Sequence, residues 1–327
     1  QALFFPLMML LIGASNLLVI YIGGNQFING KIDFGTIVEF LIYVNMLTWP
    51  VAVVGWVTSM VQQAEASQKR INEFLKEEPQ IQNLIAEATP ILGKIEFKNL
   101  SFTYPDTKIT ALKDVSFTVN PGETLSIVGN TGSGKSTILE LIGRLYDVEE
   151  NQLSMDGIAI KNLNLDSLRS SIGYVPQDAF LFSDTISNNI KFGKENAVQS
   201  EVIVAAKLAS VNKNIEGFSK GYDTILGERG ITLSGGQKQR VSIARALIKD
   251  PQILLLDDCL SAVDTETEEE ILQNLHKISQ KKTTIIVSHR VSSAKNADKI
   301  IVLEEGKIIQ QGAHNELVSA EGYYKEL

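Results

Sequence analysis

"TLSIVGNTGSGKSTILELIGRLY" occupies residues 124–146 and contains three predicted elements in a fixed order. Residues 124–128 are rich in β-branched side chains and alternate between polar and apolar, which indicates a β-strand. A loop with the pattern G-x-x-x-x-G-K-S follows at 129–136, and an apolar-periodic helix is expected from about residue 135. A strand, a glycine-rich loop and a helix in this order predict an α/β fold with a phosphate-binding loop.

This loop has the residue types that a nucleotide site needs. Its glycines allow backbone N–H groups to close around phosphate oxygens, and the start of the following helix adds a positive field. Lys135 is expected to reach the β- and γ-phosphates, and the Ser136 hydroxyl is expected to bind Mg²⁺. The predicted nucleotide-binding residues here are Gly129, Asn130, Thr131, Gly132, Ser133, Gly134, Lys135, Ser136 and Thr137. The alternative is a glycine turn with a purely structural role.

Two adjacent carboxylates follow a second apolar run, in the segment ILLLDD at residues 253–258. A site for a nucleotide and Mg²⁺ needs an acidic partner at the end of a neighbouring strand, and we predict that Asp257 has this role. Asp258 comes next and is expected to face the γ-phosphate and a water molecule. The alternative is that both acids cap the helix that follows. Cys259 is the only cysteine, and we expect it to be a small, semi-buried residue behind the site.

The start of the chain differs from the rest in charge. Residues 2–30 and 40–64 carry no charged side chain, and each run exceeds the roughly 20 residues that cross a bilayer as a helix. We therefore predict two membrane helices, at about 2–22 and 37–64. The alternative is a pair of buried core helices in a soluble protein.

The charges around these helices predict their orientation. The link between the helices holds Lys31, whereas Lys69, Arg70 and Lys76 follow the second helix. Positive residues are more frequent on the cytoplasmic side, so the link is expected outside and the rest of the chain in the cytoplasm. The net charge of the 327 residues is −8, which argues against a nucleic-acid partner.

The segment LSGGQKQRVSIARALIKDP, residues 233–251, closely resembles the ATPase domain of ABC transporters. We call its first five residues, Leu233, Ser234, Gly235, Gly236 and Gln237, the signature segment. They are expected to begin a helix, so that their N–H groups and the helix dipole form an outward-facing anion site. The resemblance implies that this site closes on the γ-phosphate of ATP bound by a second ATPase domain. The local alternative is an ordinary helix N-cap.

Other motifs of the family occur in the expected order. Tyr104, in FTYP, matches the aromatic residue that stacks on adenine, although it also suits a strand core. Gln177, in VPQDAFLF, matches the glutamine that reaches Mg²⁺ and the attacking water. Asp264, at the end of SAVD, matches the loop that crosses the dimer interface. His289, after the predicted strand TTIIV, matches the histidine that contacts the γ-phosphate, although a lone histidine in this place is often structural.

The resemblance covers essentially the whole chain and implies its architecture. The segment TILGERG at 224–230 resembles a loop of ABC exporters, and residues 1–78 resemble the last two membrane helices of an exporter half-transporter with their cytosolic extension. A linker is expected at 79–92 and the ABC ATP-binding domain at 93–327. The implied fold is an α/β P-loop NTPase, with antiparallel β and helical subdomains, preceded by an all-α transmembrane segment. Further membrane helices are expected before this sequence in the whole protein.

The resemblance also implies the chemistry and the partners. ATP and Mg²⁺ are the expected cofactors, and Lys135, Gln177, Asp258 and His289 are the expected catalytic residues. The expected Mg²⁺ ligands are Ser136, Gln177 and Asp257. A second half-transporter chain, identical or different, is the expected partner. The protein is expected to be integral to the inner or plasma membrane, with a cytoplasmic ATPase domain and a transported substrate that the sequence does not specify.

Asp258 departs from the family pattern, because most ABC transporters have glutamate there as the general base for water. Three functions therefore compete. The first is a subunit of an ATP-driven exporter, and the second is a regulatory subunit whose own site binds ATP but hydrolyses it slowly. The third, an ABC ATPase that acts on nucleic acid or the ribosome, conflicts with the two uncharged helices and the acidic net charge.

Overall fold

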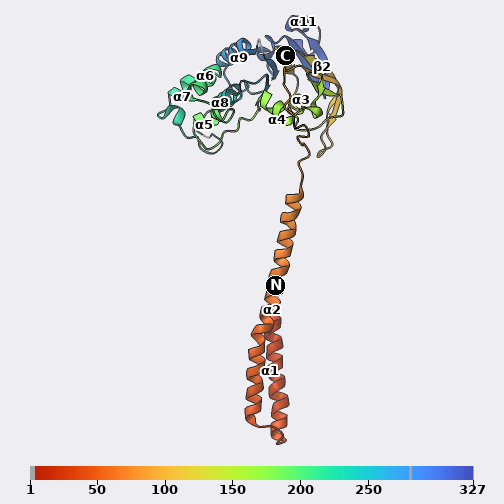
Figure 1. The fold of residues 1–327 in the computed structure, drawn as a ribbon, viewed down its shortest axis with the longest axis vertical. Coiled ribbons are helices and arrows are strands. Elements are labelled where there is room, and N and C mark those ends of the chain that lie inside the picture. The colour runs from red at the N-terminus through yellow and green to blue at the C-terminus, as the bar shows by residue number, and fades with distance from the viewer. Residues whose placement is uncertain (1–3, 231, 280–281, 327) are drawn as a thin grey trace. The chain divides into compact units, whose positions relative to one another are not determined.

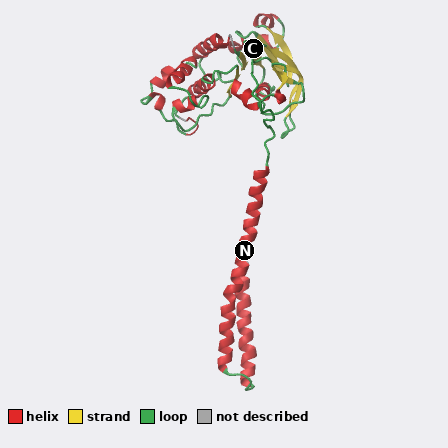
Figure 2. Cartoon of the chain, in the orientation of Figure 1, coloured by secondary structure: helices red, strands yellow, loops and turns green. Residues whose placement is uncertain are grey.

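The computed structural model describes residues 4–230, 232–279 and 282–326. Contacts between residues divide the chain into two compact units, Gln1–Pro79 and Gln80–Leu327. The first unit is built from helices and the second from helices and strands (Figures 1 and 2).

The first unit is a helical hairpin of α1, Phe4–Ile28, and α2, Phe34–Lys76. Both helices are long and apolar enough to cross a membrane, by length and composition. Helix α1 extends beyond the predicted end at residue 22, and positions 2 and 3 of the prediction lie outside the described residues. Gly23 lies where α1 meets α2, since a Cβ there would be only 2.9 Å from Ile37 Cγ1. A residue without a side chain therefore permits close packing of the two helices.

Helix α2 is one continuous helix that includes both the predicted membrane helix at 37–64 and most of the extension expected after it. It begins three residues earlier than expected, because the Asp33 side chain accepts a hydrogen bond from the Phe34 N–H and caps the helix. It continues to Lys76 because residues 65–76 include good helix formers and contain neither glycine nor proline.

The second unit contains two sheets. The smaller sheet has the order β2-β1-β4-β5 and is antiparallel: β1 Ile95–Thr103, β2 Thr110–Val119, β4 Leu153–Met155 and β5 Ile158–Ala159. The larger has the order β10-β9-β3-β8-β7-β6: β3 Thr124–Val128, β6 Ile172–Val175, β7 Ile253–Asp257, β8 Thr283–Val287, β9 Lys299–Glu304 and β10 Lys307–Gly312. Its strands are parallel except for β10, which pairs with β9 in the antiparallel sense. The predicted α/β architecture with additional antiparallel strands is confirmed.

Helices follow most of the parallel strands. The α-helices are α3 Lys135–Ile142, α4 Leu165–Ser171, α5 Ile186–Lys191, α6 Gln199–Leu208, α7 Asn212–Glu216, α8 Gly235–Leu247, α9 Thr265–Ser279, α10 Val291–Ala294, α11 His314–Ser319 and α12 Tyr323–Glu326. Short 3₁₀ turns occur at η1 Ile160–Asn162, η2 Gly221–Asp223 and η3 Glu228–Gly230. Helices α5 to α8 lie together in Figure 1, between β6 and β7 in the sequence, and form the predicted helical subdomain.

Strand β7 connects the two main apolar cores of this unit. Its residues Ile253 and Leu255 pack into the core of the two sheets and α3, whereas Leu254 and Leu256 pack into the core of the helical subdomain. Successive side chains of a strand point to opposite faces, so an uninterrupted apolar run is what such a doubly covered strand requires. Both faces of β7 are buried along its whole length, and its last residue is Asp257. The buried strand therefore determines the position of the two carboxylates at its end.

The segment predicted as a linker, 79–92, lies mostly with the second unit. The Asn83 amide donates to Asp166 Oδ2 at 2.9 Å, and the Leu165 N–H donates to Asn83 Oδ1 at 2.9 Å. The backbone N–H groups of Leu92 and Lys94 donate to the Asp156 carboxylate. These contacts hold the segment against the rest of the second unit, although it contains no helix or strand.

Candidate functional site

The strand order places the predicted site residues at one edge of the larger sheet. Strands β3, β8, β7 and β6 are neighbours and run parallel. Their carboxyl ends therefore meet at the same edge, where ligands bind in open α/β sheets. The glycine-rich loop follows β3, the two carboxylates end β7, and the segments with His289 and Gln177 follow β8 and β6.

The glycine-rich loop has two positions that require glycine. Gly129 has φ +150°, and a Cβ there would lie 2.1 Å from the Leu303 carbonyl oxygen. Gly134 has φ +101°, and its Cβ would lie 2.5 Å from the Ala111 carbonyl oxygen. A side chain at either position would displace the loop from the neighbouring backbone.

Lys135 begins α3 and its side chain lies inside the loop. Its Nζ donates to the carbonyl oxygens of Gly129 at 2.8 Å and Asn130 at 2.7 Å. Burial lowers the pKa of Lys135, and the negative charges of Asp258 and Asp257 oppose this shift. The ammonium is therefore held by the loop's backbone on the side where phosphates would bind.

Ser136 and Asp257 form a pair of oxygen donors. The Ser136 hydroxyl donates to Asp257 Oδ1 at 3.0 Å, and the Tyr174 hydroxyl donates to Asp257 Oδ2 at 3.4 Å. Burial raises the pKa of Asp257, and the nearby charge of Asp258 adds to the shift. No group of three or more His, Cys, Asp or Glu that could hold a metal occurs among the described residues. A hydroxyl with one carboxylate fits Mg²⁺, which is usually bound by one or two carboxylates together with substrate phosphates.

Asp258 lies near two other predicted catalytic groups, Gln177 and His289. Its Oδ2 accepts a long hydrogen bond of 3.5 Å from Gln177 Nε2 and lies 3.9 Å from His289 Nε2. Both distances exceed the usual donor–acceptor distance of about 2.9 Å. Burial raises the pKa of Asp258, while the charges of His289, Lys135 and Arg290 oppose the shift. The carboxylate is thus directed at Gln177 and His289 but lies short of both.

Tyr104 approaches the same site from the end of β1. Its hydroxyl donates to Glu140 Oε2 at 2.8 Å and lies 2.8 Å from Thr137 Oγ1. Its ring meets Phe102 and Tyr146 edge-on, at centroid distances of 5.1 and 5.3 Å. Burial raises the pKa of Tyr104 to about 12. The hydroxyl is anchored to α3, and the ring borders the open site.

These groups surround one hollow with a volume of about 270 Å³. Its lining contains Tyr104, Ile109, Thr110, Ala111, Thr131, Gly132, Gly134, Lys135, Ser136, Thr137, Gln177, Asp257, Asp258, Val287 and His289. Gly129, Asn130 and Ser133 belong to the same loop but are not part of this lining. The hollow thus brings together residues that are far apart in the sequence.

The signature segment and Asp264 are not part of this hollow. Ser234 is the N-cap of α8: its hydroxyl accepts from the Gln237 N–H at 3.3 Å, and Gln237 Oε1 accepts from the Ser234 N–H at 3.0 Å. Asp264 Oδ1 accepts from the Thr267 N–H at 2.9 Å, and this bond lowers the pKa of Asp264. Within one chain these residues therefore do not complete the nucleotide site.

Two residues near the site were missed by the sequence analysis. Tyr174 contacts Asp257, and Glu140 contacts Tyr104. The only feature of the sequence that points to the contact of Tyr174 with Asp257 is its position near the end of a strand, two residues before Pro176. Glu140 lies one helical turn after Ser136 on α3, which also carries Lys135, so it could have been placed on the side of the site.

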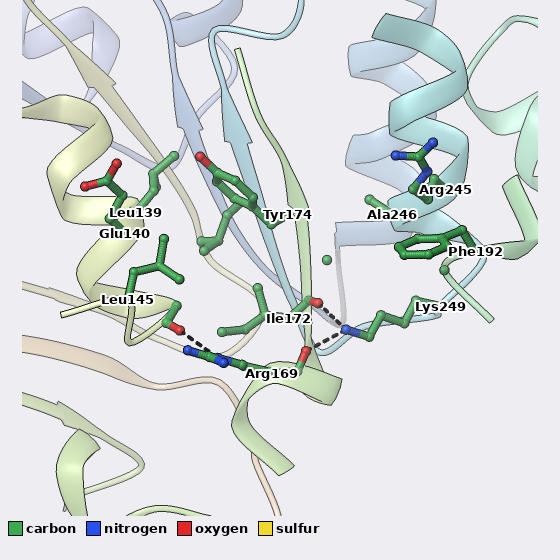
Figure 3. A pocket seen from close by; sticks show the side chains of 14 residues that line it. Leu139, Glu140, Leu145, Arg169, Ile172, Tyr174, Phe192, Arg245, Ala246 and Lys249 are labelled. Atoms are coloured by element: carbon green, nitrogen blue, oxygen red, sulfur yellow. Dashed lines mark hydrogen bonds between the residues drawn. The ribbon is translucent and has the colours of Figure 1, made fainter. Parts of the chain in front are cut away.

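A second hollow lies beside β6 and has a volume of about 330 Å³. Figure 3 shows Tyr174 and Glu140 on one side of it and Arg245, Phe192 and Lys249 on the other. Lys249 Nζ donates to the carbonyl oxygens of Arg169 and Ile172, as the dashed lines show. Tyr174 lines this hollow, and its hydroxyl donates to Asp257, which lines the first hollow.

Replacing Tyr104 with alanine is expected to weaken nucleotide binding by about 1–3 kcal/mol, if the ring stacks on a base as other aromatic side chains do. Tyr104→Phe should largely preserve binding, because the ring face remains. Binding of a fluorescent ATP analogue to the three proteins measures this. An equal loss in Tyr104→Phe and Tyr104→Ala would instead assign the effect to the hydroxyl bonded to Glu140.

The chain is similar to known proteins. Residues 112–261 match the family model described as ABC transporter. The whole chain aligns with the Multidrug resistance-like ATP-binding protein MdlA of Escherichia coli (strain K12) at 43% sequence identity, and the alignment covers 55% of that protein's length. It also aligns over its whole length with the Probable multidrug resistance ABC transporter ATP-binding/permease protein YheI of Bacillus subtilis (strain 168), at 42% sequence identity and over 56% of that protein's length.

A solved structure, "Structure of a bacterial Atm1-family ABC exporter with ATP bound", matches with a TM-score of 0.79 at 37% identity. The match covers 98% of this chain and 55% of that one. The chain therefore spans about half the length of these relatives.

Proposed function

The chain belongs to the ABC transporter family, and from this premise we propose that it is the ATP-binding and ATP-hydrolysing subunit of an ABC exporter. The observation that carries the proposal is the single hollow that joins the glycine-rich loop, Asp257, Asp258, Gln177 and His289. The two long apolar helices of the first unit support the membrane part of the proposal.

In the proposed reaction, the backbone N–H groups of the loop and the Lys135 ammonium bind the phosphates of ATP, and the Tyr104 ring stacks on the base. Ser136, Asp257 and Gln177 would hold Mg²⁺, which when bound neutralises charge on the β- and γ-phosphates. Gln177 and His289 orient a water molecule and the γ-phosphate. Asp258 accepts the proton as the water oxygen attacks phosphorus and the bond to the β-phosphate oxygen breaks.

The second half of the proposal concerns the partner and the membrane. The signature segment lies outside the chain's own hollow and presents the start of α8. We propose that this helix start binds the γ-phosphate held by a second half-transporter chain, identical or different, with Asp264 at the interface. Formation and separation of this dimer would switch the membrane helices and move a substrate across an inner or plasma membrane, with the ATPase domain in the cytoplasm.

The test uses the whole protein, reconstituted into lipid vesicles with the ATPase domain outside. Mg²⁺-dependent ATP hydrolysis and ATP-dependent uptake of lipophilic dyes are expected, since two of the relatives carry multidrug resistance in their names. Absence of both ATP binding and ATP hydrolysis would contradict the proposal. Hydrolysis without dye uptake would leave an ATPase whose substrate is of another class.

The alternative is a regulatory subunit with a slow site, and the aspartate at position 258 is the feature that suggests it. Aspartate is one methylene shorter than glutamate, and its Oδ2 lies 3.5 Å from Gln177 Nε2 and 3.9 Å from His289 Nε2. A misplacement of about 1 Å can lower a rate on the order of 100-fold. Basicity matters less, because the reference pKa values of the two side chains differ by only about 0.4.

Asp258→Glu is therefore expected to raise the steady-state rate of ATP hydrolysis, by up to about 100-fold if position alone limits the reaction. Asp258→Asn, which keeps the shape but cannot accept the proton, should lower the remaining rate. The rate is measured on the purified transporter, in which every copy of this chain carries the change. A lower rate with Asp258→Glu would mean that the pocket is built around aspartate. Equal rates in all three proteins would assign hydrolysis to a different partner chain.

A further inference from the structure

A buried ionic cluster lies beside the nucleotide site and has no part in the reaction described above. Glu268, on α9, is 1% exposed. Its Oε2 accepts from Arg290 Nη1 at 2.7 Å, and its Oε1 accepts from the Ser293 and Ser292 hydroxyls at 2.6 and 3.2 Å. A buried carboxylate holds its hydrogen-bond donors in place, because loss of one donor would leave an uncompensated buried charge.

One side of the cluster leads to His289. Arg290 follows His289 directly, and its backbone N–H donates to the Ser288 hydroxyl at 3.0 Å. Ser288 in turn donates its backbone N–H to the Ile127 carbonyl at 3.1 Å, and its hydroxyl bonds to Ser293 at 3.2 Å. The residues on both sides of His289 are therefore held, and Arg290 is held through Glu268.

The other side of the cluster leads to the loop that ends at Asp264. Arg290 Nη2 donates to the Ser261 carbonyl at 2.9 Å. The Glu268 backbone N–H donates to the Asp264 carbonyl at 2.8 Å, in the first turn of α9. One guanidinium thus touches the loop at Ser261 and the helix at Glu268, which follow Asp258 on the same segment of chain.

We propose that Glu268 and Arg290 form a positioning clamp that couples the location of the 261–264 loop to the location of His289. The proposal rests on the proposed function, in which His289 and Asp264 face the γ-phosphate and the partner chain. A partner that moves the loop would move Ser261 and α9 together, and Arg290 would carry this movement to the residue before it. Glu268 and Arg290 touch no reacting atom in this arrangement and act through His289.

Glu268→Gln is the test, because it keeps the shape and an acceptor oxygen but removes the charge that holds Arg290. In the whole protein, the rate of ATP hydrolysis at saturating ATP is expected to fall roughly 10- to 100-fold, as for a misplaced catalytic group. The KM for ATP should change less than about twofold, since the binding loop is untouched. Glu201→Gln makes the same chemical change at the exposed pair with Lys194 and should leave the rate unchanged.

The decisive comparison repeats Glu268→Gln in a His289→Ala background, with single-turnover hydrolysis of radiolabelled ATP as the readout. A residue that acts through His289 has no further effect once that side chain is absent. Equal losses in the wild-type and His289→Ala backgrounds would overturn the clamp and leave Glu268 as a general stabilising residue.

Amide hydrogen exchange provides a readout that does not depend on hydrolysis. Peptides covering residues 288–294 should exchange faster in Glu268→Gln than in the wild type, and peptides of β3 should not. Unchanged exchange at 288–294 would overturn the clamp. A wild-type protein without ATPase activity would contradict the proposed function. If the wild type hydrolyses ATP but the losses caused by Glu268→Gln and His289→Ala add up in the double variant, only the clamp is contradicted.

Discussion

Lys135→Ala is expected to reduce Mg²⁺-dependent ATP hydrolysis to background, a loss of at least about 100- to 1,000-fold by analogy with the loss of a single charge-stabilising donor. Lys135 is the only cationic side chain among the described residues that line the nucleotide hollow, apart from the ionisable His289. Its Nζ is held by the carbonyl oxygens of Gly129 and Asn130, at the mouth of the loop. Alanine leaves the backbone of α3 intact and removes the charge that would stabilise the transferred phosphate.

The chain offers a matched control for this substitution. Lys249 is half-buried, whereas Lys135 is buried, and the Lys249 Nζ likewise donates to two backbone carbonyls, those of Arg169 and Ile172. Burial lowers its pKa as it does that of Lys135. Lys249 lines the second hollow, so Lys249→Ala should lose a comparable set of hydrogen bonds and retain hydrolysis. Near wild-type activity in Lys135→Ala would refute the assignment of the loop.

The parts of the fold that the sequence predicts are those built from local patterns. Residues 124–135 form a strand, a loop and the start of a helix as expected, because the β-branched run, the glycines and the apolar periodicity all act over a few residues. The paired acids also lie at the end of their strand, and Cys259, which was expected to be semi-buried, is buried. The family resemblance predicted the order of the remaining motifs, and the parallel strand order explains why the segments with Gln177 and His289 meet the glycine-rich loop and the paired acids.

Contacts between distant residues could not be predicted in this way. The bond between Tyr104 and Glu140 requires β1 to lie beside α3, which no local pattern encodes. The cluster of Glu268 with Arg290 joins α9 to the segment after β8, so it becomes visible only when the chain is folded. From the sequence alone, charged residues such as Glu268 and Arg290 are predicted to lie on exposed surfaces.

Ser234→Arg is expected to stop hydrolysis at the facing site while sparing ATP binding by the chain's own loop. Ser234 caps α8 and forms a reciprocal pair of hydrogen bonds with Gln237, so the first N–H groups of the helix are held in place. An arginine side chain would remove this cap and fill the space that a γ-phosphate needs. Fluorescent ATP analogue binding should be retained, and steady-state hydrolysis should be lost. Loss of binding together with hydrolysis would place the signature segment in the chain's own site or indicate a folding defect.

Mixing Ser234→Arg with Lys135→Ala distinguishes a shared site from a self-contained one. If the sites form between two identical chains, a mixed dimer places both defects in one composite site and leaves the other with an intact loop and an intact signature segment. Each variant alone is then inactive, and hydrolysis reappears in the mixture. If each chain hydrolysed ATP with its own residues only, neither chain of the mixed dimer would be competent, because one lacks Lys135 and the other lacks a functional helix start. No recovery, despite subunit exchange shown by co-purification of differently tagged chains, would therefore exclude a site shared between identical copies.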